Sequence, residues 1–297
     1  MTRTAQPIRL FASEAKSHPV VLTPSDQEVA NCRLSQRSMQ TILEAMHADG
    51  LVVVQGVVDT TAIDRLNARM VEDTRTLVAR GDDGPFNYNL GNLQQSPPND
   101  PDITNAYLGE KPTMSFISSN AAVKAEVGQP VHSDADFDHP SNLEIPFAAV
   151  VNVGLIDMHP ENGSTQVWLG TQNNNVSAQD GAHGERASGR IKLDLLEKRR
   201  VVSPPIQPTV KKGSIVIRDL RLWHAGMPNK TNDVRIMLAM IHFAPWYRQR
   251  MTMKLPRALR PSIDGQDRLA LAVDWQDEPV DHLDQPFGNA FDFCQDL

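Results

Sequence analysis

The feature that most limits the fold of this chain is a series of short strand-like runs between residues 113 and 243. The runs are rich in β-branched and aromatic residues, and turn-forming residues separate them, as in Pro160-Glu161-Asn162-Gly163. They cover residues 113–118, 129–134, 148–156, 164–169, 201–202, 214–217 and 234–243. Several short strands joined by turns are typical of an antiparallel sandwich or barrel, so we predict a mainly β fold.

The residues before these runs predict helices that flank the β region. Residues 35–50 carry apolar side chains at helical spacing, and a glycine ends the segment. Residues 51–56 are rich in valine, which predicts a strand. Asp59 or Thr60 can cap a second helix over residues 61–79. A helix–strand–helix opening is therefore expected before the β region.

Four segments are predicted to lie outside the regular elements. Residues 81–102 and 173–188 are rich in polar and turn-forming residues and predict loops, the second of which can close over the mouth of the barrel. We expect residues 1–24 to form a surface arm and residues 248–297 a C-terminal extension that wraps the outside. The length fits one large domain or two small ones, and we expect a single domain over residues 1–297.

Composition excludes several classes of partner. Charged residues make up 22% and apolar residues 40%, which is ordinary for a soluble globular protein, and the net charge of -7 argues against nucleic acid. No apolar run approaches the roughly 20 residues of a membrane-spanning helix, and the first residues lack the apolar stretch of a secretory signal. Cys32 and Cys294 are the two cysteines and form no disulfide framework. We expect a cytoplasmic protein that binds a small molecule, with a homodimer left open.

The candidate chemistry lies in a His-x-Asp pair and a distant histidine. On an extended strand His132 and Asp134 would point to the same face, and His224 follows the strand-like run 214–217. Two histidines and one carboxylate, with open positions opposite, form the facial triad of non-haem Fe(II) oxygenases. A lone His-x-Asp pair is weak evidence, and Asp136 shares the face of Asp134 and competes with it.

Three motifs occurring together raise the specificity of this signal. They are Gln129-x-x-His132-x-Asp134, then Glu161-Asn162-Gly163-Ser164-Thr165, and His224 followed eleven residues later by Arg235. With them the chain resembles the phytanoyl-CoA dioxygenase family of Fe(II)/2-oxoglutarate oxygenases, most closely its fungal and bacterial members in secondary metabolism. The chain departs from the family at Leu169-Gly170-Thr171-Gln172, where Pro-Gly-Ser-His is frequent, but that histidine is not a metal ligand in the family.

The resemblance implies a fold, cofactors and residue roles. It implies a double-stranded β-helix core, also called a jelly roll and shared with cupins, that uses Fe(II), 2-oxoglutarate and O2. His132, Asp134 and His224 would be the metal ligands and catalytic centre. Arg235 would bind the distal carboxylate of 2-oxoglutarate, which suits the planar fork of a guanidinium. Gln129 and Thr165 would form hydrogen bonds with the same cosubstrate.

The implied reaction is oxidative decarboxylation of 2-oxoglutarate to succinate and CO2, coupled to oxidation of a substrate C–H bond. The outcome would be hydroxylation, desaturation, or oxidative cyclisation or rearrangement. The acidic composition favours a compact natural-product intermediate over a CoA thioester. Four residues are candidates for substrate contact: Asn89, Asn92, Asn152 and His242. For His242 a satisfied histidine in the core is the alternative.

Two other classes of function are weighed against the oxygenase. One is a metal-dependent hydrolase or isomerase on a β-barrel, because zinc also accepts histidine and aspartate ligands. Arg235, Gln129 and Thr165 argue against it, since a hydrolase has no need of a site for a dicarboxylate. The other is a non-catalytic member that binds a ligand, and the intact set of three metal ligands argues against that.

Overall fold

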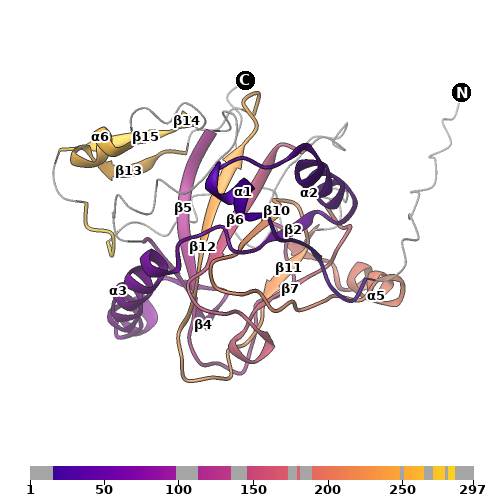
Figure 1. Cartoon of the computed structure of the whole chain (residues 1–297). Coiled ribbons are helices and arrows are strands. Elements are labelled where there is room, and N and C mark those ends of the chain that lie inside the picture. Colours follow the sequence, from indigo (N-terminus) through magenta and orange to yellow (C-terminus); the bar gives the residue numbers. More distant parts are fainter. Residues whose placement is uncertain are drawn as a thin grey trace, which may run out of the picture.

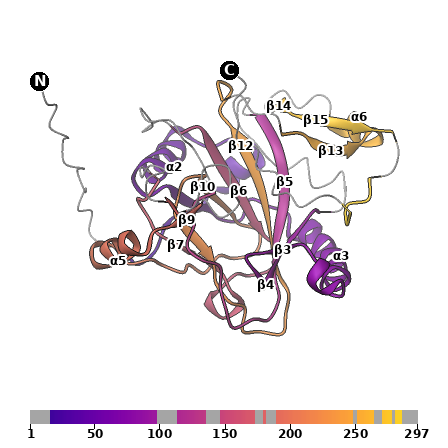
Figure 2. The ribbon, with the colours of Figure 1, turned by 180° about the vertical axis from the view of Figure 1, so that it is seen from behind.

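The structure is a computed structural model of the chain, in which long central strands are flanked by helices (Figures 1 and 2). It describes residues 16–97, 113–134, 146–172, 179–180, 189–247, 251–263, 270–277 and 280–284. The figures show α3 and the β13–β15 pair toward one side of the sheet, and α2 and α5 toward the other. No helix of these residues is long and apolar enough to cross a lipid bilayer.

Local sequence signals explain where the helices begin and end. The two long helices are α2 (Gln36–Asp49) and α3 (Thr60–Val78), and the side chains of Ser35 and Asp59 cap them by accepting hydrogen bonds from backbone N–H groups. Gly50 ends α2 in the left-handed conformation, with φ of 74°. The remaining helical segments are α1 (Asp26–Ala30), α5 (Leu193–Val202), α6 (Arg260–Ile263), η1 (Gly81–Asp83), η2 (Pro160–Asn162) and η4 (Arg257–Leu259).

One large sheet dominates the described residues and contains nine strands. They run in the order β1 (Val20–Leu22), β2 (Leu51–Val54), β10 (Ile215–Asp219), β6 (Ala148–Gly154), β12 (Arg235–Phe243), β5 (Thr113–Ala122), β4 (Asn89–Gln95) and β3 (Phe86–Asn87), and β14 (Ala270–Leu271) pairs with β5. The pairings from β2 to β3 are antiparallel. Outside this sheet, β13 (Met253–Pro256) pairs with β15 (Val273–Gln276).

A smaller layer of strands covers one face of the large sheet. Its centre is β7 (Thr165–Val167) paired with β11 (His224–Gly226). Isolated bridges extend it on both sides, from Val167 to Ile206 and from His224 through His132 to Arg190. Arg190 begins β9 (Arg190–Ile191), which pairs with β8 (Gln179–Asp180). Two antiparallel layers of this kind form the predicted jelly-roll core, so the prediction of a mainly β fold with flanking helices is confirmed.

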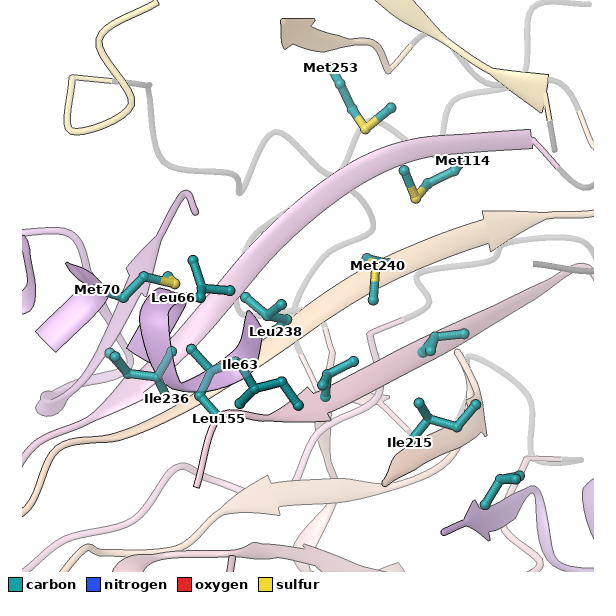
Figure 3. Close-up of a cluster of buried hydrophobic side chains, with 14 of the residues drawn as sticks. Ile63, Leu66, Met70, Met114, Leu155, Ile215, Ile236, Leu238, Met240 and Met253 are labelled. Carbon is teal, nitrogen blue, oxygen red and sulfur yellow. The ribbon is translucent and has the colours of Figure 1, made fainter. Parts of the chain in front are cut away.

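The two faces of β12 show how the layers are filled. Ile236, Leu238 and Met240 point to the outer face, where they pack against α3 and β13 (Figure 3). Successive residues of a strand alternate between faces, so Arg235 and Met237 point inward, toward the small layer. Met237 accordingly packs beside a cluster that joins both layers, with Val216 from β10 and Val167 from β7 among its members. Apolar side chains therefore fill the interior of the jelly roll around Met237.

Most of the predicted elements are confirmed, and three predictions need correction. Residues 201–202 end α5 instead of forming a strand, because they follow a run of helix-forming residues. Residues 81–102 contain β3 and β4 where a loop is predicted, because backbone pairing with β5 overrides their polar composition. Residues 129–134 make isolated bridges instead of a strand, since Pro130 has no N–H to donate.

Several predictions fall on residues outside the described ranges. Asp136, the competing carboxylate, lies outside them, as do residues 1–15 of the predicted arm and all but two residues of the predicted loop 173–188. The described end of the arm contains β1, an edge strand that pairs in parallel with β2. In the C-terminal extension, Met253 and Leu255 pack into the outer cluster.

Candidate active site

The two histidines predicted as metal ligands lie directly opposite each other in the small layer. The backbone N–H of each donates to the carbonyl oxygen of the other, with both distances 2.9 Å. This reciprocal pair fixes the two backbones side by side and brings the imidazole centroids of His132 and His224 to 4.4 Å. Both residues are buried. A sequence separation of more than ninety positions is thus closed by two backbone hydrogen bonds.

The ring orientation leaves the same nitrogen of each histidine available. His132 Nδ1 lies 2.8 Å from the carbonyl oxygen of Pro130, and His224 Nδ1 lies 2.9 Å from that of Leu222. A carbonyl only accepts, so Nδ1 must carry the proton and Nε2 keeps its lone pair. Burial lowers the pKa of His132, and burial together with the charge of Arg218 lowers the pKa of His224 to about 3. Both rings are therefore neutral at pH 7, as metal ligands must be.

Asp134 faces the two free nitrogens. One carboxylate oxygen lies 3.6 Å from His132 Nε2 and the other 3.5 Å from His224 Nε2. Burial alone would raise the pKa of Asp134, but the charge and hydrogen bond of the Arg218 guanidinium hold it well below its ordinary value. The carboxylate is therefore ionised at pH 7 and available as a ligand.

These three side chains can hold a single metal ion. Their ligand atoms all lie within 4.8 Å of one another. Two neutral imidazoles and one ionised carboxylate are the donor set of a non-haem Fe(II) site, although zinc accepts the same ligands. The residues present therefore fit the predicted metal.

Arg235 is a buried cation with neutral hydrogen-bond partners. Its side chain is 1% exposed, and burial lowers its pKa to about 10, which leaves it charged at pH 7. Its N–H groups donate to the backbone and side-chain oxygens of Asn120 and to the carbonyl of Gly163, at 2.8 to 3.2 Å. Nε has no hydrogen-bond partner, and within the described residues no carboxylate pairs with the guanidinium. A buried cation in this state fits an anionic ligand.

Gln129 and Thr165 lie around Gly226, two residues after His224. The Gly226 N–H donates to Gln129 Oε1 at 2.8 Å, which leaves the amide NH2 of Gln129 as the donating end. Thr165 is the strand partner of Gly226 in the small layer, and its hydroxyl lies 4.0 Å from the sulfur of Met237. Met237 is two residues from Arg235 on β12, and Arg235 donates to the carbonyl of Gly163, two residues before Thr165. These contacts link Arg235 and Thr165 to the strand pair that contains His224.

Amide side chains from the large sheet approach the same region. In register, Asn92 and Arg235 are both partners of Ala122, so the three share one row across the sheet. Asn92 Oδ1 is buried without a hydrogen-bond partner. Asn89 donates to the carbonyl of Gly128 and accepts from Asn92, at 3.1 and 3.0 Å. The structure therefore brings Asn89 and Asn92 to the edge of the region that contains Gln129.

The other two predicted substrate residues have different surroundings. Asn152 on β6 donates to the carbonyl of Leu238 at 3.1 Å and accepts from Arg218 Nε at 3.3 Å. His242 lies on β12, five residues after the inward-pointing Met237, and β12 pairs with β6 without a register shift. Because side chains alternate along a strand, His242 points to the outer face. Burial lowers the pKa of His242 to about 4, and its Nε2 has no hydrogen-bond partner. The structure does not bring His242 to the metal cluster.

Sequence reasoning missed three residues beside the cluster. Arg218 on β10 contacts Asp134 directly, and the signal for it was a charged residue inside the buried run Ile215–Asp219. Tyr88 has φ of 68°, which is unusual for a residue other than glycine, and its ring centroid lies 4.9 Å from that of His132. The guanidinium of Arg190 lies 5.7 Å from the Tyr88 ring. No sequence pattern links Tyr88 or Arg190 to the metal ligands.

Solved structures with a similar architecture include three named proteins. EctD from S. alaskensis with bound Fe is 18% identical, with a TM-score of 0.49, and the match covers 88% of this chain and 94% of that chain. The epimerase SnoN, in complex with Fe3+, alpha ketoglutarate and nogalamycin RO, is 15% identical, with a TM-score of 0.49 and coverage of 70% and 84%. AviO1 from Streptomyces viridochromogenes Tue57 is 16% identical, with a TM-score of 0.45 and coverage of 70% and 95%.

A family model covers the part of the chain that contains the cluster. The model for phytanoyl-CoA dioxygenase (PhyH) matches residues 92–237, from β4 into β12. This span includes both histidines and the aspartate of the possible metal site, and Arg235. Residues 92–237 therefore match the phytanoyl-CoA dioxygenase (PhyH) family, and the chain is a 2-oxoglutarate-dependent non-haem iron oxygenase.

Proposed function

We propose that this enzyme oxidises a C–H bond of a small natural-product intermediate, with Fe(II) held by His132, Asp134 and His224. The observation that carries the assignment is Arg235, a buried cation that pairs with no carboxylate among the described residues. It donates to Gly163, which precedes the strand β7 that pairs with the His224 strand. A dicarboxylate that chelates the metal at one end would neutralise the cation at the other. A hydrolase has no use for such a cation.

The three ligands prepare the site for the metal. When bound, the iron would couple oxidative decarboxylation of 2-oxoglutarate to oxidation of the substrate by O2. The carbonyls of Pro130 and Leu222 hold each Nδ1–H, so each Nε2 lone pair is directed without rotation of the ring. Asp134 supplies the single negative charge among the three. The reciprocal backbone pair between the histidines keeps the spacing of the ligands fixed.

Arg235, Gln129 and Thr165 would bind the cosubstrate. The distal carboxylate would accept hydrogen bonds from Arg235, whose Nε is available. Gln129 and Thr165 would donate from the opposite layer, where Gly226 holds both in place. The buried side chains of Trp168 and Trp223, which pack together beside His224, would exclude water from this side.

The substrate would meet the site near β4. Asn89 and Asn92 are the predicted substrate residues that lie closest in the fold to Gln129, and the buried Oδ1 of Asn92 can accept a hydrogen bond. Asn152 would act less directly, because both ends of its amide have protein partners. The orientation of His242 toward the outer face supports its alternative role in the core.

Anaerobic titration tests the metal and cosubstrate sites. Fe(II) and then 2-oxoglutarate are added to the protein, and the visible charge-transfer band of the chelate is recorded. The band is expected in the wild type and absent in His224→Ala. Lys198→Ala, which removes an exposed ion pair on α5, is the control and should keep the band. A band of full intensity in His224→Ala would overturn the ligand assignment.

A coupling assay tests the substrate class. Small natural products are incubated aerobically with the enzyme, Fe(II) and 2-oxoglutarate, and succinate is measured together with product mass. A true substrate should raise succinate formation and gain one oxygen or lose two hydrogens. Asn92→Ala should lower the ratio of product to succinate without weakening 2-oxoglutarate binding. If Asn92→Ala forms succinate with the wild-type ratio of product to succinate, Asn92 is not part of the substrate site.

A further inference from the structure

Arg218 is a buried arginine whose role is not explained by the ligand set. It lies near the end of β10, and its side chain shares the inner face of the sheet with Val216. The residue is 6% exposed. A charge in this position is costly unless it is paired, so its partners indicate its role.

The partners of Arg218 connect the large sheet to the metal cluster. One terminal nitrogen donates to Asp134 Oδ2. Nε donates to Asn152 Oδ1 at 3.3 Å, and the Asn152 amide donates to the carbonyl of Leu238 at 3.1 Å. The guanidinium is thus held by β6, which is held in turn by β12. Asp134 lies in a bend two residues after the bridged His132, and this contact joins its carboxylate to β10.

A neighbouring buried ion pair, between Arg221 and Asp219, differs from the Arg218–Asp134 contact in its geometry. Arg221 donates through Nε and a terminal nitrogen to both oxygens of Asp219, each at 2.8 Å. Both residues are buried, and the guanidinium engages both oxygens of the carboxylate. Arg218 instead contacts Asp134 at one oxygen, which leaves the other facing His132. The single contact orients the carboxylate and leaves it free to bind a metal.

We propose that Arg218 is a positioning residue of the iron site, acting through the Asp134 carboxylate and held in place by Asn152. The inference rests on the proposed assignment of Asp134 as a metal ligand. The guanidinium fixes the plane of the carboxylate and offsets its charge in a buried site. Without this contact the carboxylate would be free to rotate away from the two histidines, and it would bind the metal as a stronger electron donor when it did bind.

The test compares Arg218→Met with Arg221→Met, which removes the neighbouring buried pair as a matched control. Fe(II) affinity is measured by anaerobic calorimetry, and thermal unfolding of the metal-free proteins is measured in parallel. Loss of a group that orients a metal ligand costs about 10- to 100-fold in metal affinity, and this loss is expected for Arg218→Met. Arg221→Met should lower the unfolding temperature but keep the wild-type Fe(II) affinity.

Two further variants keep the test decisive if Arg218→Met does not fold. Arg218→Lys keeps the charge and loses the fork, so its loss of Fe(II) affinity should be smaller than that of Arg218→Met. Asn152→Ala should weaken Fe(II) binding in the wild type and have little added effect in Arg218→Lys, because the two act through one contact. In each variant that binds, the band of the 2-oxoglutarate chelate should move to longer wavelength.

Specific results would overturn the inference. Wild-type Fe(II) affinity and an unshifted band in Arg218→Lys and Asn152→Ala would do so, as would equal losses in Arg218→Met and Arg221→Met. These outcomes presume that the wild type binds Fe(II) and forms the chelate. Failure of the wild type to do either would instead contradict the proposed function, so the two failures are distinguishable.

Discussion

Replacing Arg235 by lysine tests the part of the site that distinguishes an oxygenase from a hydrolase. The guanidinium now donates to three oxygens, of Asn120 and Gly163, and a bound dicarboxylate would add contacts to the remaining donors. Lysine keeps the charge but presents a single nitrogen, which cannot hold those oxygens and both oxygens of a carboxylate. Binding of the distal carboxylate should weaken even though the cation is retained.

The size of the effect follows from the bonds lost. A hydrogen bond to a charged group contributes about 1.5–3 kcal/mol, and Arg235→Lys removes at least one such bond to the carboxylate. Since about 1.4 kcal/mol corresponds to a factor of ten, 2-oxoglutarate should bind roughly 10- to 140-fold more weakly. Fe(II) affinity should stay within about twofold, because Arg235 contacts none of the three metal ligands.

The assay measures cosubstrate affinity anaerobically from the chelate band, with 2-oxobutyrate as a matched ligand. This acid chelates through the same oxo and carboxylate groups but has no distal carboxylate. The wild type should prefer 2-oxoglutarate, and Arg235→Lys should lose most of that preference while its affinity for 2-oxobutyrate changes little. An undiminished preference in Arg235→Lys would refute the role given to this residue.

Three more variants separate the site from the scaffold. In Gly226→Ala the added Cβ would lie 2.6 Å from Gln129 Oε1. Binding of 2-oxoglutarate, measured from the chelate band, should therefore weaken several-fold while Fe(II) affinity stays unchanged. Unaltered 2-oxoglutarate binding would show that Gln129 is not needed in its present position. Leu238→Ala removes a buried side chain from the outer face of β12. It should lower the free energy of unfolding, measured by denaturant titration, by about 2–5 kcal/mol. Loss of Fe(II) affinity without loss of stability would contradict the placement of Leu238 on the outer face. Burial lowers the pKa of His242 from 6.5 to about 4 in the folded protein. As the pH falls, this imidazole therefore takes up a proton in the unfolded chain before it does so in the folded protein. The free energy of unfolding should fall as pH drops from about 6.5 toward 4. His242→Phe should remove up to about 3 kcal/mol of that pH dependence, and an identical pH profile in the variant would count against a buried neutral imidazole.

The metal ligands and Arg235 could be predicted from sequence because chemistry restricts their residue types and spacing. His132 and Asp134 are two positions apart, and an extended backbone brings them to one face even without a regular strand. His224 had to come from a distant segment, and the motif around it supplied that link. Helices α2 and α3 were predictable for a different reason, since their caps and apolar spacing are local signals.

The parts that sequence could not supply depend on contacts between distant segments. Arg218 meets Asp134 across 84 positions, and nothing near either residue indicates the contact. The segment that forms β4 is polar enough to predict a loop, yet the edge of β5 offers backbone groups that pair with it. Tyr88 reaches His132 through a left-handed backbone conformation that composition does not reveal for tyrosine.

Succinate formation from 2-oxoglutarate in the presence of Fe(II) and O2 tests the central claim most directly when Asp134→Ala is compared with Asp136→Ala. The first variant removes the carboxylate that lies 3.5 and 3.6 Å from the two histidine nitrogens. The second removes the competing carboxylate two positions later, which is outside the described residues. The wild type and Asp136→Ala are expected to form succinate, and Asp134→Ala is expected to form none. Succinate formation retained in Asp134→Ala and lost in Asp136→Ala would contradict the central claim.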